Sequence, residues 1–108
     1  MNSNFNEELE LEILEQKIKE AQLNNLPIDK FVLRQIEILQ YTIDTFMNRM
    51  AGEDRLNDIQ VVEIEIQQYA VMRELAKKIN LKTDKYEKHI NEIKKRIFGD
   101  GDIDKIFK

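Results

Sequence analysis

Few residues in this chain could carry out chemistry, and the only histidine is the first to consider. His89 precedes Glu92 by three residues, which places both side chains on one face of a helix. A di-iron site in a helical bundle needs two Glu-x-x-His pairs and two further Glu residues, and a structural zinc site needs four Cys or His ligands. Because the chain has one histidine and no cysteine, we expect neither a metal site nor a cofactor.

The residues needed for nucleophilic catalysis are equally scarce. Ser3 is the only serine and lies next to the N-terminus, where chain ends are poorly ordered. Glu63 and Glu65 project from different sides of a helix, so they cannot form a close carboxylate pair within it. Without a nucleophile and a matching base, we predict that the chain is not an enzyme.

The C-terminal residues 99–108 contain a weak calcium-loop pattern. Asp100, Asp102 and Asp104 alternate as the first ligands of such a loop do, but its sixth position is Lys105 instead of glycine and no twelfth-position Glu follows. We therefore predict a short flexible tail, separate from a single domain over residues 1–98. The tail has three apolar residues, which would pack on the domain or on another protein: Ile103, Ile106 and Phe107.

Composition indicates a soluble helical domain. Hydrophobic residues make up 42% of the chain, enough for a core, and there are only three glycines and one proline. The absence of cysteine, of a signal-peptide pattern and of a long apolar run predicts a cytoplasmic protein without a membrane span. The net charge of −4 is unevenly distributed, since residues 1–20 hold six Glu and two Lys while residues 82–98 hold six basic residues and three acidic ones.

Hydrophobic periodicity predicts four helices over residues 6–24, 28–51, 54–79 and 85–98. The second has apolar residues at alternating spacings of four and three, as in helices that pack lengthwise on their neighbours: Val32, Ile36, Leu39, Ile43, Phe46 and Met50. Gly52 is expected to end this helix in the left-handed conformation. The fold class predicted is all-α, an antiparallel four-helix bundle built from long helical hairpins.

Helices 6–24 and 54–79 carry more apolar residues than one buried stripe requires. In the third helix, Ile59, Val62 and Tyr69 project to one side, whereas Val61, Ile64 and Val71 project to another. A helix that is apolar around most of its circumference is buried on several sides, either by its own chain or by a partner. Of these two explanations we favour the partner, because contiguous apolar surface usually marks an interaction site.

The sequence thus predicts a protein-interaction module that acts in assembly, as an adaptor or in regulation by binding. Its partner would be another protein or a second copy of the chain. The residues expected to contact it lie off the main apolar stripes of the first and third helices: Leu9, Ile13, Val61, Ile64 and Val71.

An alternative function follows from a family resemblance. Residues 74–97 resemble the helix-turn-helix of LuxR-type regulators, with matching residues at Leu75, Ala76, Ile79, Leu81, Tyr86, His89 and Ile90. The resemblance implies a DNA-binding regulator whose last helix enters the major groove. Lys85 and Lys88 would then face the DNA, and Lys94, Lys95 and Arg96 would reach phosphates. An antiparallel helical hairpin with a basic end would explain the same residues without DNA.

Overall fold

The computed structural model describes residues 3–98 of the chain, and these form four α-helices. The helices are α1 (Ser3–Leu23), α2 (Asp29–Gly52), α3 (Ile59–Lys78) and α4 (Asp84–Phe98). The predicted tail at 99–108, with its calcium-like aspartates, lies outside the described residues. Helix α3 begins five residues later than the periodicity suggested, because Asp58 is its N-cap and accepts a hydrogen bond from the Gln60 N–H.

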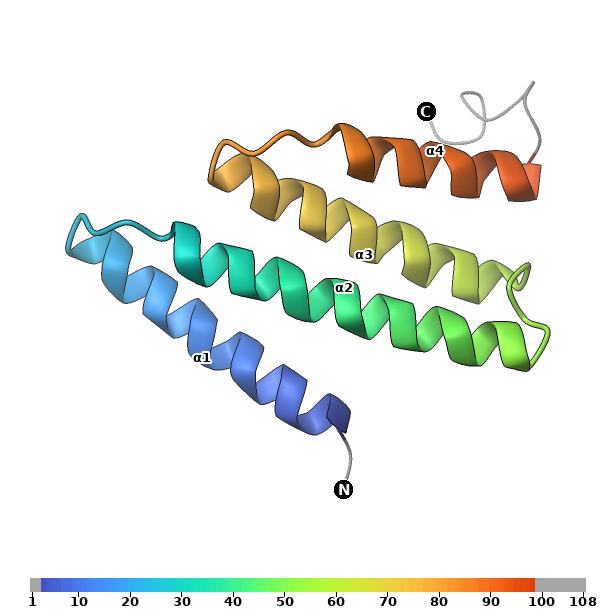
Figure 1. Cartoon of the computed structure of the whole chain (residues 1–108), viewed down its shortest axis with the longest axis horizontal. Coiled ribbons are helices and arrows are strands. Elements are labelled where there is room, and N and C mark those ends of the chain that lie inside the picture. The colour runs from blue at the N-terminus through green and yellow to red at the C-terminus, as the bar shows by residue number, and fades with distance from the viewer. Residues whose placement is uncertain (1–2, 99–108) are drawn as a thin grey trace.

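The predicted fold class is confirmed: the described chain is all-α, and helices consecutive in sequence pack antiparallel against each other. Within residues 3–98, close backbone approach is restricted to the pairs α1–α2, α2–α3 and α3–α4. Figure 1 shows α1 and α4 at opposite edges of the array. The dimensions, 48 × 36 × 18 Å, and the radius of gyration of 15.9 Å describe a flatter body than a closed domain, for which about 13 Å is typical at this length.

Two groups of buried side chains hold the helices together. The larger group joins the middle of α2 to α3 and α4 and consists of Ile43, Val62, Tyr69, Met72, Ala76, Tyr86, Ile90 and Ile93. The smaller group lies at the end where α1 meets α2 and α3, and it contains Ile18, Val32 and Ile79 with half-buried Leu75 packed against it. Only this second group brings side chains of α1 and α3 together, so α1 is packed on two helices at one end only.

All three helix connections begin with the same local structure. Asn25, Asp54 and Asn80 adopt the left-handed conformation, with φ of 57°, 58° and 60°. The residue after each donates its N–H to a carbonyl five residues back, as Leu26 does to Ala21 and Leu81 to Ala76, which is the Schellman motif. Asn and Asp are the residues other than glycine that tolerate this conformation best. Each helix end is thereby fixed without glycine.

The expectation for Gly52 was wrong. Gly52 is the last residue of α2, and the left-handed residue is Asp54, two positions later. Sequence alone misplaced this helix end because glycine is the usual residue at that position, and here an aspartate occupies it. A Cβ atom added at Gly52 would meet no atom within 4 Å apart from its chain neighbours and the adjacent backbone of its own helix.

We therefore expect Gly52→Ala to stabilise the fold. Alanine restricts the unfolded chain and fits the helical backbone, so the free energy of unfolding should rise by roughly 0.5–1 kcal/mol. Asp54→Ala should lower it by about 1 kcal/mol, because alanine disfavours the left-handed conformation. Urea denaturation followed by circular dichroism measures both changes. Destabilisation by Gly52→Ala would contradict the assignment of this helix end.

Candidate partner-binding groove

Four of the five residues predicted to contact a partner have exposed side chains. On α1, Leu9 is 47% exposed and Ile13 is 46% exposed. On α3, the exposed fractions are 39% for Ile64 and 47% for Val71. Each pair lies along one side of its helix, because residues four or seven apart face the same way.

The fifth residue, Val61, was assigned to the wrong surface, since its side chain is only 1% exposed and belongs to the core. Val61 lies four residues before Glu65 and eleven before Met72, and both of these side chains are also buried. The buried arc of α3 is wider than a single stripe because both α2 and α4 pack on it. Part of the apolar excess that suggested a partner is therefore covered by the chain's own helices.

The exposed apolar residues of α1 and those of α3 do not form one surface. Ile18 marks the side of α1 that packs near α3, because it shares a buried group with Ile79. At about 100° per residue, Leu9 and Ile13 project roughly 140–180° away from Ile18. They consequently lie on the far side of α1, and only Ile64 and Val71 are on the α3 side that could meet a partner between these helices.

A groove between α2 and α3 adjoins Ile64. It encloses a cavity of about 160 Å³, and its walls are largely apolar, formed by Thr42, Ile43, Thr45, Phe46, Arg49, Ile64 and Gln68. A cavity of roughly 150 Å³ accommodates a benzene ring, so this groove has room for one aromatic or leucine-sized side chain. The Arg49 guanidinium stacks over the Phe46 ring, 5.6 Å from its centroid.

Gln68 is an unusual member of the groove. Its Oε1 atom is buried and has no hydrogen-bond partner among the described residues. Buried carbonyl oxygens nearly always accept a hydrogen bond, and an unsatisfied one costs free energy. The groove therefore combines apolar walls with one unsatisfied acceptor, which a bound group could reach only after rotation of the Gln68 side chain.

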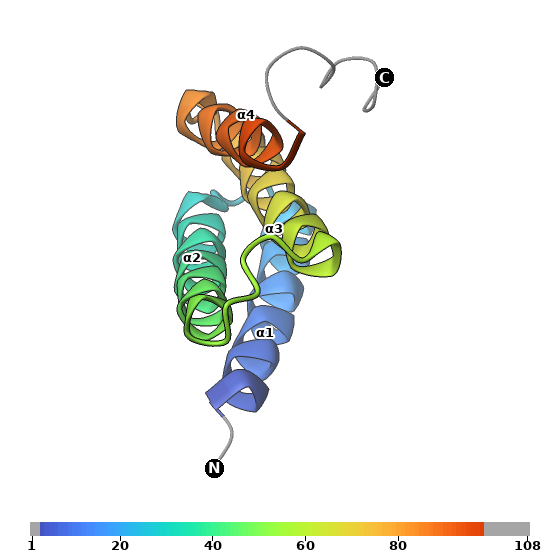
Figure 2. The same ribbon diagram turned by 90° about the vertical axis from the view of Figure 1, so that its right-hand side faces the viewer.

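Among the side chains that the structure describes, those of α1 border the groove and do not line it. Thr42 lines the groove, and its hydroxyl lies 2.9 Å from the Glu7 carboxylate and 2.8 Å from the Ile38 carbonyl, the two acceptors of its single proton. Toward the other end of α1, Ile18 packs beside Leu75 and Ile79 and covers that part of α3. In Figures 1 and 2, α1 and α3 lie close together at that end and diverge toward the N-terminus of α1. The groove opens where the two helices separate.

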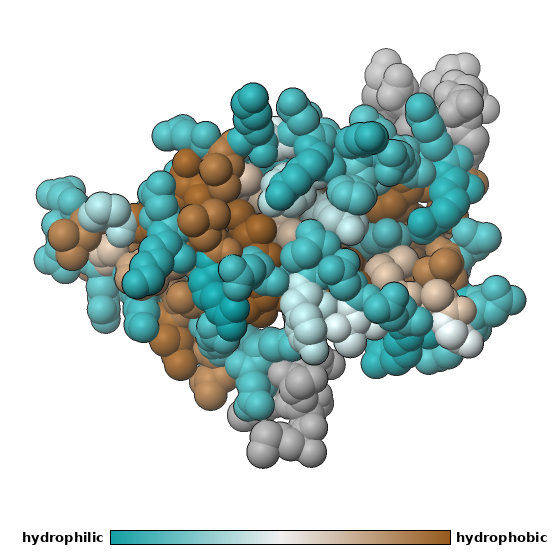
Figure 3. Space-filling model, in the orientation of Figure 1, coloured by the Kyte–Doolittle hydropathy of each residue, from teal (hydrophilic) through white to brown (hydrophobic). Residues whose placement is uncertain are grey.

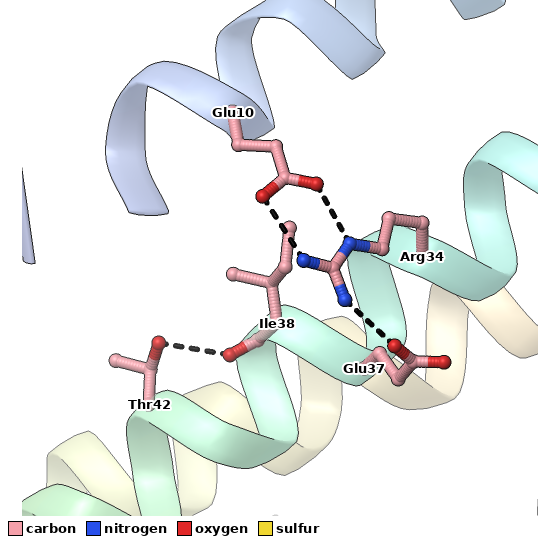
Figure 4. A network of polar contacts seen from close by, with 5 residues as sticks. All are labelled: Glu10, Arg34, Glu37, Ile38 and Thr42. Carbon is pink, nitrogen blue, oxygen red and sulfur yellow. Dashed lines mark hydrogen bonds and ion pairs between the residues drawn. The ribbon is translucent and has the colours of Figure 1, made fainter. Parts of the chain in front are cut away.

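An ion pair fixes this half of α1 to α2 (Figure 4). The guanidinium of Arg34 donates to both carboxylate oxygens of Glu10, at 2.7 and 3.1 Å, and its remaining nitrogen donates to Glu37 at 2.7 Å. The hydrogen bonds from Arg34 hold the pKa of Glu10 below its ordinary value. This ion pair therefore helps to position the N-terminal half of α1 beside the groove.

Apolar surface also occurs at the opposite end of the array. On the face drawn in Figure 3, the largest apolar area lies in the half of the view that contains the α1–α2 and α3–α4 connections. Leu23, Leu26 and Leu81, in or beside these connections, are exposed. Leu26 and Leu81 each follow the left-handed residue of a Schellman motif, where an apolar residue commonly packs on the helix end. A role in the helix end thus accounts for two of these three leucines.

The α3–α4 pair has the geometry of a hairpin. His89 stacks on Tyr69 with ring centroids 4.8 Å apart, and Arg96 bonds to Glu65 at 2.9 Å, so α4 runs antiparallel along the length of α3. The helices of a helix-turn-helix instead cross at about 90–120°. This geometry favours the hairpin over the DNA-binding motif that residues 74–97 resemble.

The basic residues proposed to contact nucleic acid have other neighbours in the structure. Arg96 pairs with Glu65, which is 7% exposed, and the Lys85 ammonium lies 5.0 Å from the centre of the Tyr86 ring. Lys88 and Lys95 are exposed on α4, but they border the same shallow surface as three carboxylates, those of Asp84, Glu87 and Glu92. Lys94 is half-buried. The basic face of α4 is therefore interrupted by acidic side chains.

The remaining chemistry of the described residues is limited. Within residues 3–98, no group of three or more histidine, aspartate or glutamate side chains is placed to hold a metal ion. No helix in this part of the chain is both long and apolar enough to cross a membrane. Comparison with known proteins found no matching family model, no similar curated protein and no similar solved structure.

The Glu10–Arg34 pair should make the attachment of α1 depend on pH. Since folding lowers the pKa of Glu10, the pair stabilises the fold fully above the ordinary carboxyl pKa, and this contribution is lost as the pH falls through the lowered value. Carbon-detected NMR titration of the Glu10 carboxyl should show a pKa below about 4.3. Arg34→Gln should return it to that value; an unchanged titration in this variant would contradict the pairing.

Removing Arg96 should destabilise the fold because Glu65 would remain buried without a partner. We expect Arg96→Ala to lower the free energy of unfolding by about 1–3 kcal/mol. Lys95→Ala, at the exposed neighbouring position, should change it by less than about 0.5 kcal/mol. Adding Glu65→Gln to Arg96→Ala should recover part of the loss. Equal effects of Arg96→Ala and Lys95→Ala in urea denaturation would show that the pair contributes nothing.

Proposed function

We propose that this chain is a protein-interaction domain whose α2–α3 groove receives an apolar side chain from a helix of a partner protein. The observation that carries the proposal is the exposed Ile64 at the edge of a cavity of about 160 Å³. Recognition of an amphipathic helix in an apolar groove is a common mode of protein binding. The action would be assembly, adaptor activity or regulation by binding, without catalysis.

Three features of the groove support this proposal. Its volume fits one large anchor side chain, as the centres of interfaces often require. Val71 lies seven residues after Ile64 and extends the apolar edge of the groove by two helical turns along α3. The Gln68 Oε1 atom is buried and unsatisfied among the described residues, and rotation of its side chain would let it accept a hydrogen bond from the incoming helix. In contrast, Leu9 and Ile13 do not line this groove and lie on the far side of α1, so we leave them out of the proposed contact.

The size of the groove also sets the strength of the expected complex. Full burial of one aromatic or leucine side chain contributes about 1.5–3 kcal/mol, whereas association costs at least about 4 kcal/mol. The anchor alone therefore cannot hold a partner, and the surrounding surface of α1 and α3 has to contribute. We expect a reversible complex rather than a permanent one.

A displayed library of amphipathic helical peptides tests this function. Peptides selected on the wild-type chain should bind about tenfold or more weakly to Ile64→Asp, because the charge would border the cavity. Ile13→Asp is the matched control: the same residue type, with similar exposure, on the far side of α1. The selected peptides should bind this variant as tightly as the wild-type chain. Selected peptides that bind Ile64→Asp as tightly as the wild-type chain would contradict the proposed groove.

Light scattering across a range of concentrations distinguishes a second copy of the chain from a different protein as the partner. A particle mass that stays at 12.9 kDa supports a different protein. A concentration-dependent dimer abolished by Ile64→Asp but not by Ile13→Asp would assign the groove to self-association and overturn the proposal of a separate partner.

A further inference from the structure

We infer that the helix held in the groove is a basic one, with its cationic side chains directed at α1. This inference rests on the proposed function and adds the chemical class of the partner. It derives from charge: the groove has an apolar floor on α2 and α3, and the helix along its open side is strongly acidic.

The side of α1 that faces α3 can be identified from its packing. Ile18 belongs to the buried group shared with Ile79, and Glu8, Leu11 and Glu15 precede it at intervals of three and four residues. All four residues therefore project to the same side of the helix. Leu11 is half-buried, whereas Glu8 and Glu15 are exposed. A helix placed between α1 and α3 would meet these two carboxylates.

The acidic charge on this part of α1 is only partly compensated by cations of the described residues. Residues 3–16 contain five Glu and no Lys or Arg. Glu7 is hydrogen-bonded by Thr42 and Glu10 by Arg34, but Glu8 and Glu15 form no ion pair within the described residues. Lys17 and Lys19 come later, toward the end where α1 meets α3. The open end of the groove thus keeps a negative potential.

The opposite wall adds no positive charge to balance it. The side chains of α3 that line the groove, Ile64 and Gln68, are uncharged. Arg49 of α2 is the only cation among the residues that line the groove, and its guanidinium is stacked on Phe46. An acidic helix would therefore be repelled by α1 without gaining a cationic wall, whereas a basic helix would be attracted.

The chain's own basic helix does not fit the role of this occupant. Helix α4 carries five Lys and Arg residues, but its apolar residues are buried against α3. In a second copy, α4 could offer no anchor side chain without leaving its own core. The occupant we infer is consequently a basic amphipathic helix of a different protein.

Two synthetic peptides test the inference. Both carry Leu, Phe and Leu at positions i, i+4 and i+7; one has Lys at its polar positions and the other has Glu. Isothermal calorimetry should show about tenfold tighter binding of the Lys peptide to the wild-type chain at low salt. Raising the ionic strength from about 50 mM to about 500 mM should reduce this preference, because screening weakens the attraction.

Charge reversal on α1 provides the decisive variant. Glu8→Lys combined with Glu15→Lys should lower affinity for the Lys peptide about tenfold and raise affinity for the Glu peptide. Glu87→Lys combined with Glu92→Lys makes the same charge change on exposed residues of α4, which does not contact α1. This control should leave the preference largely intact, and circular dichroism verifies that both variants remain helical.

The outcomes separate the inference from the function on which it rests. Equal binding of both peptides, with loss of binding in Ile64→Asp, would overturn the charge preference and keep the groove. Binding of the Lys peptide that survives Ile64→Asp, or that falls equally in both charge-reversed variants, would show unspecific attraction and overturn both. Absence of binding of either peptide at about 1 mM would also contradict both.

Discussion

The arrangement of the four helices depends on the wide apolar arc of α3. Buried residues occupy that arc from Val61 and Val62 through Tyr69 and Met72 to Ala76, too broad a surface for one neighbouring helix to cover. Helix α2 packs on one part of it and α4 on another, and each connection is short enough to keep these neighbours antiparallel. Helix α1, attached through α2, reaches α3 only near Leu75 and Ile79. The bundle therefore stays open along one side of α3.

The two halves of α1 are held by different forces, and this difference affects the groove. Ile18 anchors the C-terminal half in an apolar cluster. The described polar contacts of the N-terminal half include the part-buried hydrogen bond between Glu7 and Thr42 and the exposed ion pair between Glu10 and Arg34. Exposed ion pairs contribute little stability, so we expect the wall nearest the opening to be the most easily displaced. An incoming helix could adjust that wall without disturbing the core of α2, α3 and α4.

Periodicity and composition were sufficient to predict the fold class and four helices, because each helix carries a long apolar repeat and few breaks. They could not predict which apolar residues of α3 would be buried by the neighbouring helices and which would stay exposed. Val61 and Ile64 are both aliphatic residues off the main stripe, and only the positions of α2 and α4 determine that one is buried and the other exposed. Gly52 was misjudged for a related reason: Asp54, an uncommon choice, took the left-handed conformation that glycine usually supplies.

The groove itself could not be found in the sequence, because its lining combines residues with different sequence patterns. Phe46 belongs to the core repeat of α2, Ile64 is an apparent surplus residue of α3, and Thr42 and Gln68 read as ordinary polar positions. Exposure does not identify the groove either, since Ile13 and Ile64 are exposed to similar degrees. What distinguishes Ile64 is the concave surface beside it. A partner contacts an apolar side chain on a convex surface from one side only. A cavity, in contrast, encloses the incoming side chain and so removes more of its surface from water. The concave surface between α2 and α3 beside Ile64 is thus the feature on which the proposed binding site rests.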